Sequence, residues 1–240
     1  MNGPRLIARL ALLVAGLVTI SLGTAAPPAQ AAEQTPGIDV SNHQPTIDWS
    51  AVRASGVRWT YVLATEGTSF RNPIFASQYV GSYRAGLIRG AYHMAHPLNS
   101  SGAAQARYFL ANGGRWSADG RTLPGALDLE QRCGDLAGTR MRAWIVEFQS
   151  TYRAATGRYA VIYTSPSWWR QCVGTWSAGS AAYPLWIANY RVSRPTIPAG
   201  WSYYTMWQWT DRGRTDGIPR PVDRNRFNGS LSRLQAFALG

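Results

Sequence analysis

Apolar, β-rich segments alternate with stretches of helical periodicity from residue 37 to residue 173. Strands are expected at residues 37–40, 57–64, 87–94, 124–130 and 159–163, and helices at 47–54, 73–85, 101–112, 139–156 and 166–173. Repeated strand–helix units of this kind form parallel strands joined by helical crossovers. Such strands are buried on both faces, which accounts for continuous apolar runs such as Tyr61-Val62-Leu63-Ala64. The sequence therefore predicts an α/β fold built on a parallel sheet.

The last third of the chain breaks this alternation. Strand candidates at 185–188, 203–209 and 221–224 are joined by segments rich in proline and glycine, and neither segment can hold a helix. A parallel crossover needs a dozen or more residues and usually a helix, so we expect at least one late strand to run antiparallel. Five βα units followed by three strands describe a shortened TIM-like barrel. A last amphipathic segment, 231–239, is expected to close its bottom or side.

The first 31 residues have the pattern of a secretory signal peptide. Arg5 and Arg9 precede an apolar run at 10–22, and Ala29-Gln30-Ala31 supplies the small-x-small pattern of a cleavage site. We expect cleavage after Ala31, a linker at 32–36 and one barrel domain at 37–240. The apolar run is shorter than the roughly 20 residues of a membrane span, so no stable membrane anchor is expected, with an uncleaved anchor as the alternative. The mature protein is expected to be a secreted, extracellular monomer.

The charge of the chain is strongly positive. All 24 basic residues are arginines and the acidic residues number 12, which gives a formal charge of +12. Such an excess predicts polyanionic surroundings, namely nucleic acid, an anionic membrane or an anionic cell wall. Export disfavours nucleic acid, and no recognition helix, RNA-binding sheet motif or zinc knuckle accompanies the charge, so no nucleic-acid partner is expected. A wall rich in phosphates and carboxylates fits better, unless the arginines serve only solubility.

The two cysteines, Cys133 and Cys172, suggest one disulfide, because an even number in an exported protein is typical of a bridge. A closed loop of this size contributes about 3 to 4 kcal/mol by the loop-entropy relation. Two separate buried thiols are the alternative. Neither cysteine lies near His43, His93 or His96 in the sequence, so we expect no metal site.

Carboxylates follow the predicted strands. Asp39 ends the first strand, Glu66 follows the second, Asp128 and Glu130 end the fourth, and Asp223 lies in the eighth. The carboxyl ends of barrel strands meet at one rim, where the chemistry of such folds is located. Asp128 and Glu130 are two residues apart on one strand, so both point into the same cleft. Repulsion between them raises the pKa of one and keeps it protonated as a general acid, which cleavage of an acetal requires. The alternative is a non-catalytic role, in which the two acids face solvent or pair with arginine.

Seven signatures, in order, resemble the glycoside hydrolase family 25 lysozymes, which are N-acetylmuramidases. They are Gly37-Ile38-Asp39-Val40-Ser41 with Gln44, Ala64-Thr65-Glu66-Gly67, Gly90-Ala91-Tyr92-His93, Leu127-Asp128-Leu129-Glu130, Ile162-Tyr163-Thr164, Leu185-Trp186-Ile187-Ala188-Asn189-Tyr190 and Trp207-Gln208-Trp209. Asp223, in Val222-Asp223-Arg224-Asn225, is similar to the aspartate of the family's last strand. The resemblance covers residues 37–229 and implies a barrel of five βα units followed by three strands.

The resemblance implies hydrolysis of the β-1,4 bond between N-acetylmuramic acid and N-acetylglucosamine in bacterial peptidoglycan, without a cofactor. Glu130 is then the general acid that protonates the leaving oxygen, and Asp128 orients the 2-acetamido group or stabilises positive charge. Asp39 and Asp223 hold sugar hydroxyls or water, with turn or network roles as the alternative for both. A pair of acids two apart on one strand suits attack by the acetamido oxygen. We therefore expect net retention through an oxazolinium-like intermediate.

Aromatic residues are the second informative feature, with 11 Trp and 12 Tyr against 6 Phe. Tyrosine and tryptophan combine a flat apolar face with a polar group, which suits sugar rings. We expect substrate contacts from a set of residues at strand ends, with a plain core role equally open for its aromatic members. The set is Tyr92, Tyr163, Trp186, Tyr190 and Gln208.

Two other functions stay open at this point. A carbohydrate-binding protein that has lost activity would bind walls without turnover, although the acids at every rim position argue against it. A chitinase would prefer chitin oligomers to muramyl substrates.

Overall fold

The computed structural model describes residues 1, 3, 33–176 and 182–240. The chain divides into two units, Met1–Ala31 and Ala32–Gly240. The expected signal peptide at 1–31 lies outside the described residues except for residues 1 and 3, and so does residue 32 of the expected linker. Strand β1 (Thr35–Val40) begins two residues before the expected strand, so it includes residues 35 and 36 of that linker.

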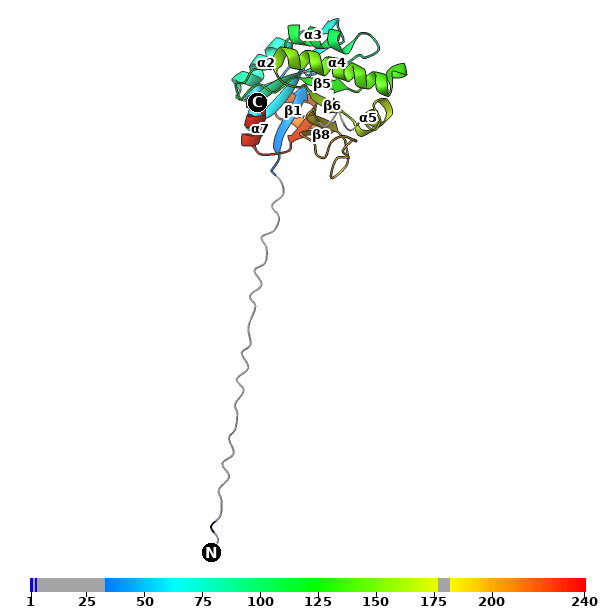
Figure 1. Cartoon of the computed structure of the whole chain (residues 1–240). Helices are drawn as coiled ribbons and strands as arrows, with labels where there is room; N and C mark the ends of the chain where they lie inside the picture. The colour runs from blue at the N-terminus through cyan, green and yellow to red at the C-terminus, as the bar shows by residue number, and fades with distance from the viewer. Residues whose placement is uncertain (2, 4–32, 177–181) are drawn as a thin grey trace. The chain divides into compact units, whose positions relative to one another are not determined.

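Eight strands of the second unit close into a barrel (Figure 1). After β1 come β2 (Trp59–Glu66), β4 (Ile88–Met94), β5 (Ala126–Leu129), β6 (Val161–Thr164), β7 (Leu185–Ala188), β8 (Met206–Thr215) and β9 (Ile218–Phe227), and β9 pairs back with β1. A ninth strand, β3 (Phe70–Arg71), pairs only with the end of β2. The helices are α1 (Trp49–Ala54), α2 (Phe75–Arg84), α3 (Gly102–Ala111), the 3-10 turn η1 (Gly134–Leu136), α4 (Thr139–Thr156), α5 (Pro166–Cys172) and α7 (Leu231–Leu239).

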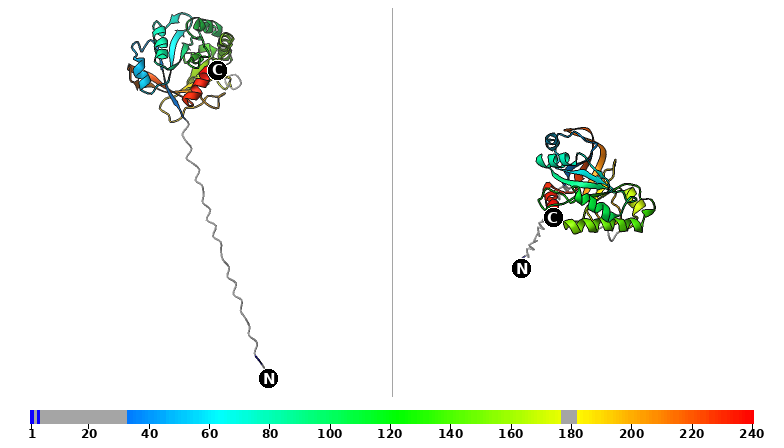
Figure 2. Two further views of the ribbon diagram at one scale, coloured as in Figure 1. Left: turned by 90° about the vertical axis from the view of Figure 1, so that its left-hand side faces the viewer. Right: turned by 90° about the horizontal axis from the view of Figure 1, so that it is seen from above.

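Strand direction confirms the predicted class. Neighbouring barrel strands run parallel from β1 to β8, whereas β9 runs antiparallel to both β8 and β1. Helices α1 to α5 lie in the connections of the first five units, and α3 and α4 pack side by side (Figure 1, Figure 2). The segment 189–205 between β7 and β8 contains no helix. The α/β fold is thus a shortened TIM-like barrel with five βα units followed by three strands.

The hairpin of β8 and β9 is longer than its sequence predicts. Each strand has 10 residues and extends well beyond its pairing with β7 or β1. The glycines that suggest a loop belong to the hairpin: Gly217 adopts φ +87 in its turn, and Gly213 lies under the side chain of Arg224. The extension lacks period-two apolar alternation because most of its residues are exposed or half-buried.

The interior of the barrel is filled by side chains. Tyr61 and Trp186 stack inside it with their ring centroids 4.9 Å apart, and Tyr61 donates a 2.7 Å hydrogen bond to the carbonyl of Pro124. Leu234 and Ala238 of α7 are buried in the same cluster, against the amino ends of the parallel strands. The terminal helix therefore closes the bottom of the barrel, and the carboxyl ends of the parallel strands are left for a site.

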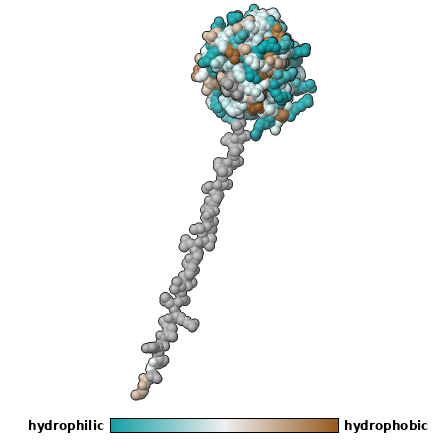
Figure 3. Space-filling view, turned by 45° about the vertical axis from the view of Figure 1, so that its right-hand side comes forward, coloured by the Kyte–Doolittle hydropathy of each residue, from teal (hydrophilic) through white to brown (hydrophobic). Residues whose placement is uncertain are grey.

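The predicted disulfide is confirmed. Cys133, just after β5, is bonded to Cys172 at the end of α5, with 5.8 Å between their Cα atoms. The bond ties the segment that follows Glu130 to a helix of the outer layer. Among the described residues no helix has the length and apolarity of a membrane span. The face drawn in Figure 3 is largely hydrophilic, with isolated apolar residues.

Candidate active site

A cavity of about 350 Å³ lies at the carboxyl ends of the parallel strands. Its size is within the range of small-ligand sites. All four predicted carboxylates and all five predicted substrate contacts line it: Asp39, Asp128, Glu130, Asp223, Tyr92, Tyr163, Trp186, Tyr190 and Gln208. Residues from β1, β4, β5, β6, β7, β8 and β9 are thereby brought to one place.

Asp128 and Glu130 enter this cavity together. Asp128 lies on β5 beside Met94 of β4 and Tyr163 of β6, and Leu129 between the two acids is buried in the layer under the helices. Alternation along the strand therefore directs both acids inward, as their spacing predicts. Asp128 is 5% exposed, whereas Glu130 stands at the open mouth.

The surroundings of both acids favour the protonated form. Burial, reinforced first by the charge of Glu130, raises the pKa of Asp128 well above its usual range. Its Oδ1 is buried and has no hydrogen-bond partner among the described residues. Partial desolvation by the cleft walls, followed by the charges of Asp39 and Glu66, raises the pKa of Glu130. The pair therefore keeps a proton at a pH where ordinary carboxyls are ionised.

Asp39 and Asp223 form a second carboxyl pair. They are register partners on the antiparallel strands β1 and β9 and share a hydrogen bond. Burial, and then the charge of Asp39, raises the pKa of Asp223 to about 9. Burial also raises the pKa of Asp39, although hydrogen bonds to its carboxylate oppose this. Asp223 is therefore the protonated partner at neutral pH and donates to Asp39.

Two amides hold the Asp39 carboxylate in place. Gln208 Nε2 and Asn225 Nδ2 donate to its Oδ2 at 2.9 and 2.6 Å. The two amides are neighbours in the register of β8 and β9. Each amide oxygen is itself engaged, since Tyr163 donates to Gln208 at 2.8 Å and the Trp186 indole donates to Asn225 at 2.8 Å. The N–H groups of both amides are thereby directed at Asp39.

Several of the predicted substrate contacts take part in this network and support Asp39 through hydrogen bonds. Trp186 is 2% exposed, its indole N–H is used, and its ring packs on Tyr61 and Tyr163. Its geometry favours the core alternative. Tyr190 also donates to Gln208 and is only half-buried, so its ring still borders open space. Burial raises the pKa of Tyr92 well above its usual range, so its phenol stays neutral beside the acids.

Two further acids line the cavity. Glu66, expected at this rim but without an assigned role, is the last residue of β2, and its Oε2 lies 3.5 Å from His96 Nε2. Asp211 lies on the extension of β8, and no motif marks it because the extension itself lacks a strand pattern. Six of the twelve acidic residues of the chain thus surround one cavity, and no arginine among the described residues lines it.

His93 serves the structure of the barrel. It is fully buried and makes hydrogen bonds through Nδ1 with Thr65 Oγ1 at 2.8 Å and through Nε2 with Gln105 Oε1 at 3.0 Å. Burial lowers the pKa of His93 to about 4, so the ring is neutral. Within 33–176 and 182–240, no group of three or more His, Cys, Asp or Glu side chains is arranged to hold a metal ion.

Comparison with known proteins agrees with this geometry. Residues 38–218 match the model of the glycosyl hydrolases family 25. Lysozyme M1 of Streptomyces globisporus is 49% identical over 84% of this chain and 70% of its own length, and the N,O-diacetylmuramidase of Chalaropsis sp is 46% identical over 85% and 99%. The crystal structure of the bacterial lysozyme from Streptomyces coelicolor superposes with a TM-score of 0.84 and 48% identity, covering 86% of this chain and 98% of that one. The chain belongs to glycosyl hydrolase family 25 and is a glycoside hydrolase.

Proposed function

We propose that the protein is a muramidase that hydrolyses the β-1,4 bond between N-acetylmuramic acid and N-acetylglucosamine in bacterial peptidoglycan. The observation that carries the proposal is the entry of Asp128 and Glu130 into one cavity, where both carboxyls have raised pKa values. The names of the relatives, lysozyme and N,O-diacetylmuramidase, support the same substrate.

Glu130 is the proposed general acid. It stands at the open mouth, where the oxygen of a departing sugar can reach it, and its raised pKa keeps a proton on it. As the bond from C1 to the leaving oxygen breaks, that oxygen takes the proton from Glu130. A positioned acid of this kind contributes about 10²- to 10⁴-fold to the rate.

Asp128 is proposed to hold the 2-acetamido group of the muramic acid. Its Oδ1 is a buried acceptor without a partner among the described residues, and the acetamido N–H is a matching donor. A hydrogen bond to the charged form lowers the pKa of Asp128, so substrate binding favours Asp128 as the anion and leaves the proton on Glu130. The anion then stabilises the positive charge that develops on the acetamido group.

The proposed reaction proceeds in two steps with net retention. The acetamido oxygen attacks C1 while the leaving sugar departs with the proton of Glu130, which gives an oxazolinium-like intermediate. Water then adds to C1, Glu130 takes its proton, and the oxazoline ring opens. Asp39, held by Gln208 and Asn225, and Asp223 are proposed to bind sugar hydroxyls or the water.

Mass spectrometry of digested walls tests the bond that is cleaved. Borohydride reduction of the products should place the reduced residue on muramic acid. Reduced glucosamine at the new ends, or faster cleavage of chitin oligomers than of muramyl oligomers, would overturn the proposal.

Proton NMR of the first product tests the stereochemical course separately. The β-anomer is expected to appear first and then to equilibrate. Initial formation of the α-anomer would exclude retention and leave the identity of the bond untouched.

Secretion is also a proposal, supported by the arginines, apolar run and Ala-Gln-Ala site of the first 31 residues and by the disulfide. If the chain is exported and cleaved after Ala31, the mature chain begins at Ala32. N-terminal sequencing of protein from the culture medium measures this, and a cell-bound chain that keeps residues 1–31 would contradict it.

A further inference from the structure

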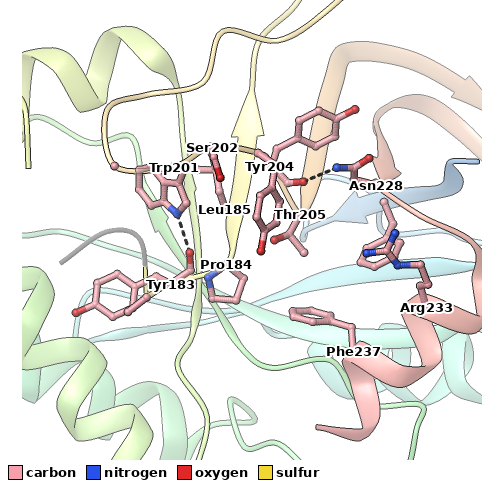
Figure 4. A pocket seen from close by; sticks show the side chains of 14 residues that line it. Tyr183, Pro184, Leu185, Trp201, Ser202, Tyr204, Thr205, Asn228, Arg233 and Phe237 are labelled. Atoms are coloured by element: carbon pink, nitrogen blue, oxygen red, sulfur yellow. Dashed lines mark hydrogen bonds between the residues drawn. The ribbon is translucent and has the colours of Figure 1, made fainter. Parts of the chain in front are cut away.

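A second cavity, of about 500 Å³, lies at the end of the barrel opposite the carboxylates. Its walls are residues 182–185 at the start of β7, residues 200–205 before β8, residues 227–228 at the end of β9, and Arg233 and Phe237 of α7 (Figure 4). The parallel strands β7 and β8 begin here, whereas the carboxylate cavity lies at their other ends. One sugar residue therefore cannot occupy both.

The walls of this cavity are aromatic and held in place. Tyr204, Phe237 and Pro184 surround the hollow, with Asn228 and Arg233 on the side of α7 (Figure 4). The Trp201 indole donates to the carbonyl of Tyr183 at 2.7 Å, and Asn228 Nδ2 donates to the carbonyl of Tyr204 at 2.9 Å. Flat rings beside hydrogen-bonding groups suit the C–H faces and hydroxyl edges of a sugar.

The charge of this cavity is opposite to that of the catalytic one. None of its lining residues is acidic, and Arg233 is exposed at its edge. Among the described residues, the Arg233 guanidinium has no ion pair and no hydrogen bond. A free guanidinium beside aromatic rings favours a ligand that combines a sugar ring with a carboxylate.

We propose that this cavity is a non-catalytic binding site for an N-acetylated amino sugar that carries a free carboxylate, as an uncapped N-acetylmuramic acid residue does. The inference rests on the proposed function for its choice of polymer. The sugar ring lies against Tyr204 and Phe237, the carboxylate accepts from Arg233, and Asn228 Oδ1 accepts from a hydroxyl. A molecule with sites at both ends of its barrel stays attached to the wall while its cleft cleaves another strand.

Titration followed by ¹⁵N–¹H NMR tests the site without turnover. Trp201 lines this cavity and Trp186 lines the catalytic one, so their indole N–H signals, assigned through Trp→Phe variants, report the two cavities separately. N-Acetylmuramic acid should shift the Trp201 signal at lower concentration than N-acetylglucosamine does. An unmoved Trp201 signal, or equal effects of the two sugars, would overturn the proposal. A tighter response to glycerol phosphate would overturn the sugar assignment and point to wall phosphates.

A charge variant with a matched control tests the role of Arg233. In Arg233→Gln the dissociation constant for N-acetylmuramic acid should rise about tenfold, because a hydrogen bond to a charged group is lost. The dissociation constant of Arg233→Lys should lie between those of the native protein and Arg233→Gln. Arg170→Gln removes one charge from the exposed face of α5, outside this cavity, and should behave as the native protein. If Arg233→Gln and Arg170→Gln bind N-acetylmuramic acid equally weakly, the effect comes from the net charge of the protein and the proposed role of Arg233 is wrong.

Retention on walls gives the functional readout. Arg233→Gln should bind insoluble peptidoglycan about tenfold more weakly and release product from it more slowly, with unchanged kcat/KM on soluble muramyl oligomers. Unchanged retention would overturn the proposal. A native protein that cleaves no muramyl substrate would refute the proposed function, while the titration would still show whether the second cavity binds the sugar.

Discussion

Removing the Cys133–Cys172 bond should cost the fold about 4 kcal/mol. The bond joins residues 39 apart in the sequence, and the loop-entropy relation for a closed loop of that length gives about 4 kcal/mol at room temperature. Both sulfurs are buried in the layer between barrel and helices, so the loss of packing in a Cys133→Ser/Cys172→Ser variant adds to this figure.

Urea unfolding of the protein measures the effect. The double variant should unfold at lower urea with a free energy of unfolding at least about 3 kcal/mol below that of the native protein. Native protein unfolded in the presence of a reductant keeps both sulfur atoms and reports the cross-link alone. In the absence of urea, the protein with the bond and the protein without it should have matching near-UV circular dichroism spectra, because the cross-link acts mainly on the unfolded chain.

A loss below about 1 kcal/mol in both experiments would refute the reasoning, since it would mean that the unfolded chain is already held compact without the bond. A large loss in the variant with none in the reduced native protein would assign the effect to packing.

Three further predictions concern the acids and the barrel core. The pKa of Asp223 is about 9 in the folded chain against 3.8 ordinarily, so between these pH values the folded chain binds more protons than the unfolded chain. The free energy of unfolding should therefore fall as the pH rises from about 4 to about 9. Asp223→Asn should flatten the slope of the urea midpoint against pH. Glu66→Gln removes a charge that raises the pKa of Glu130, so the basic limb of the kcat/KM profile should move to lower pH, and an unmoved limb would contradict this. Gly90→Ala places a methyl group 2.7 Å from Cδ1 of Tyr61 and should destabilise the barrel by about 1 to 3 kcal/mol, whereas an unchanged melting temperature would refute this packing.

The barrel could be predicted from the sequence because each of its units repeats one physical pattern. Buried parallel strands leave continuous apolar runs, and the long helix α4 is predicted with its observed bounds, 139–156, from its apolar periodicity. The β8–β9 extension could not be predicted, since strands that leave the barrel are freed from apolar alternation. Asp211 lies on this extension and could not be predicted as a site residue for the same reason.

The carboxylates of the site were predictable through strand geometry. Residues two apart on a strand share a face, so Asp128 and Glu130 had to enter the same space once β5 belonged to the barrel. The roles of the surrounding residues were not predictable in this way. That Gln208 and Trp186 support Asp39, directly or through Asn225, depends on side-chain hydrogen bonds between strands far apart in the sequence.

The proton carried by Glu130 is most directly tested by comparing two leaving groups in the Glu130→Gln variant. With a sugar as the leaving group, kcat/KM should fall about 10²- to 10⁴-fold relative to the native protein. With a nitrophenol, which departs without protonation, the two proteins should differ little. Equal losses on both substrates would contradict the account, because they would show that Glu130 does not deliver a proton to the departing oxygen.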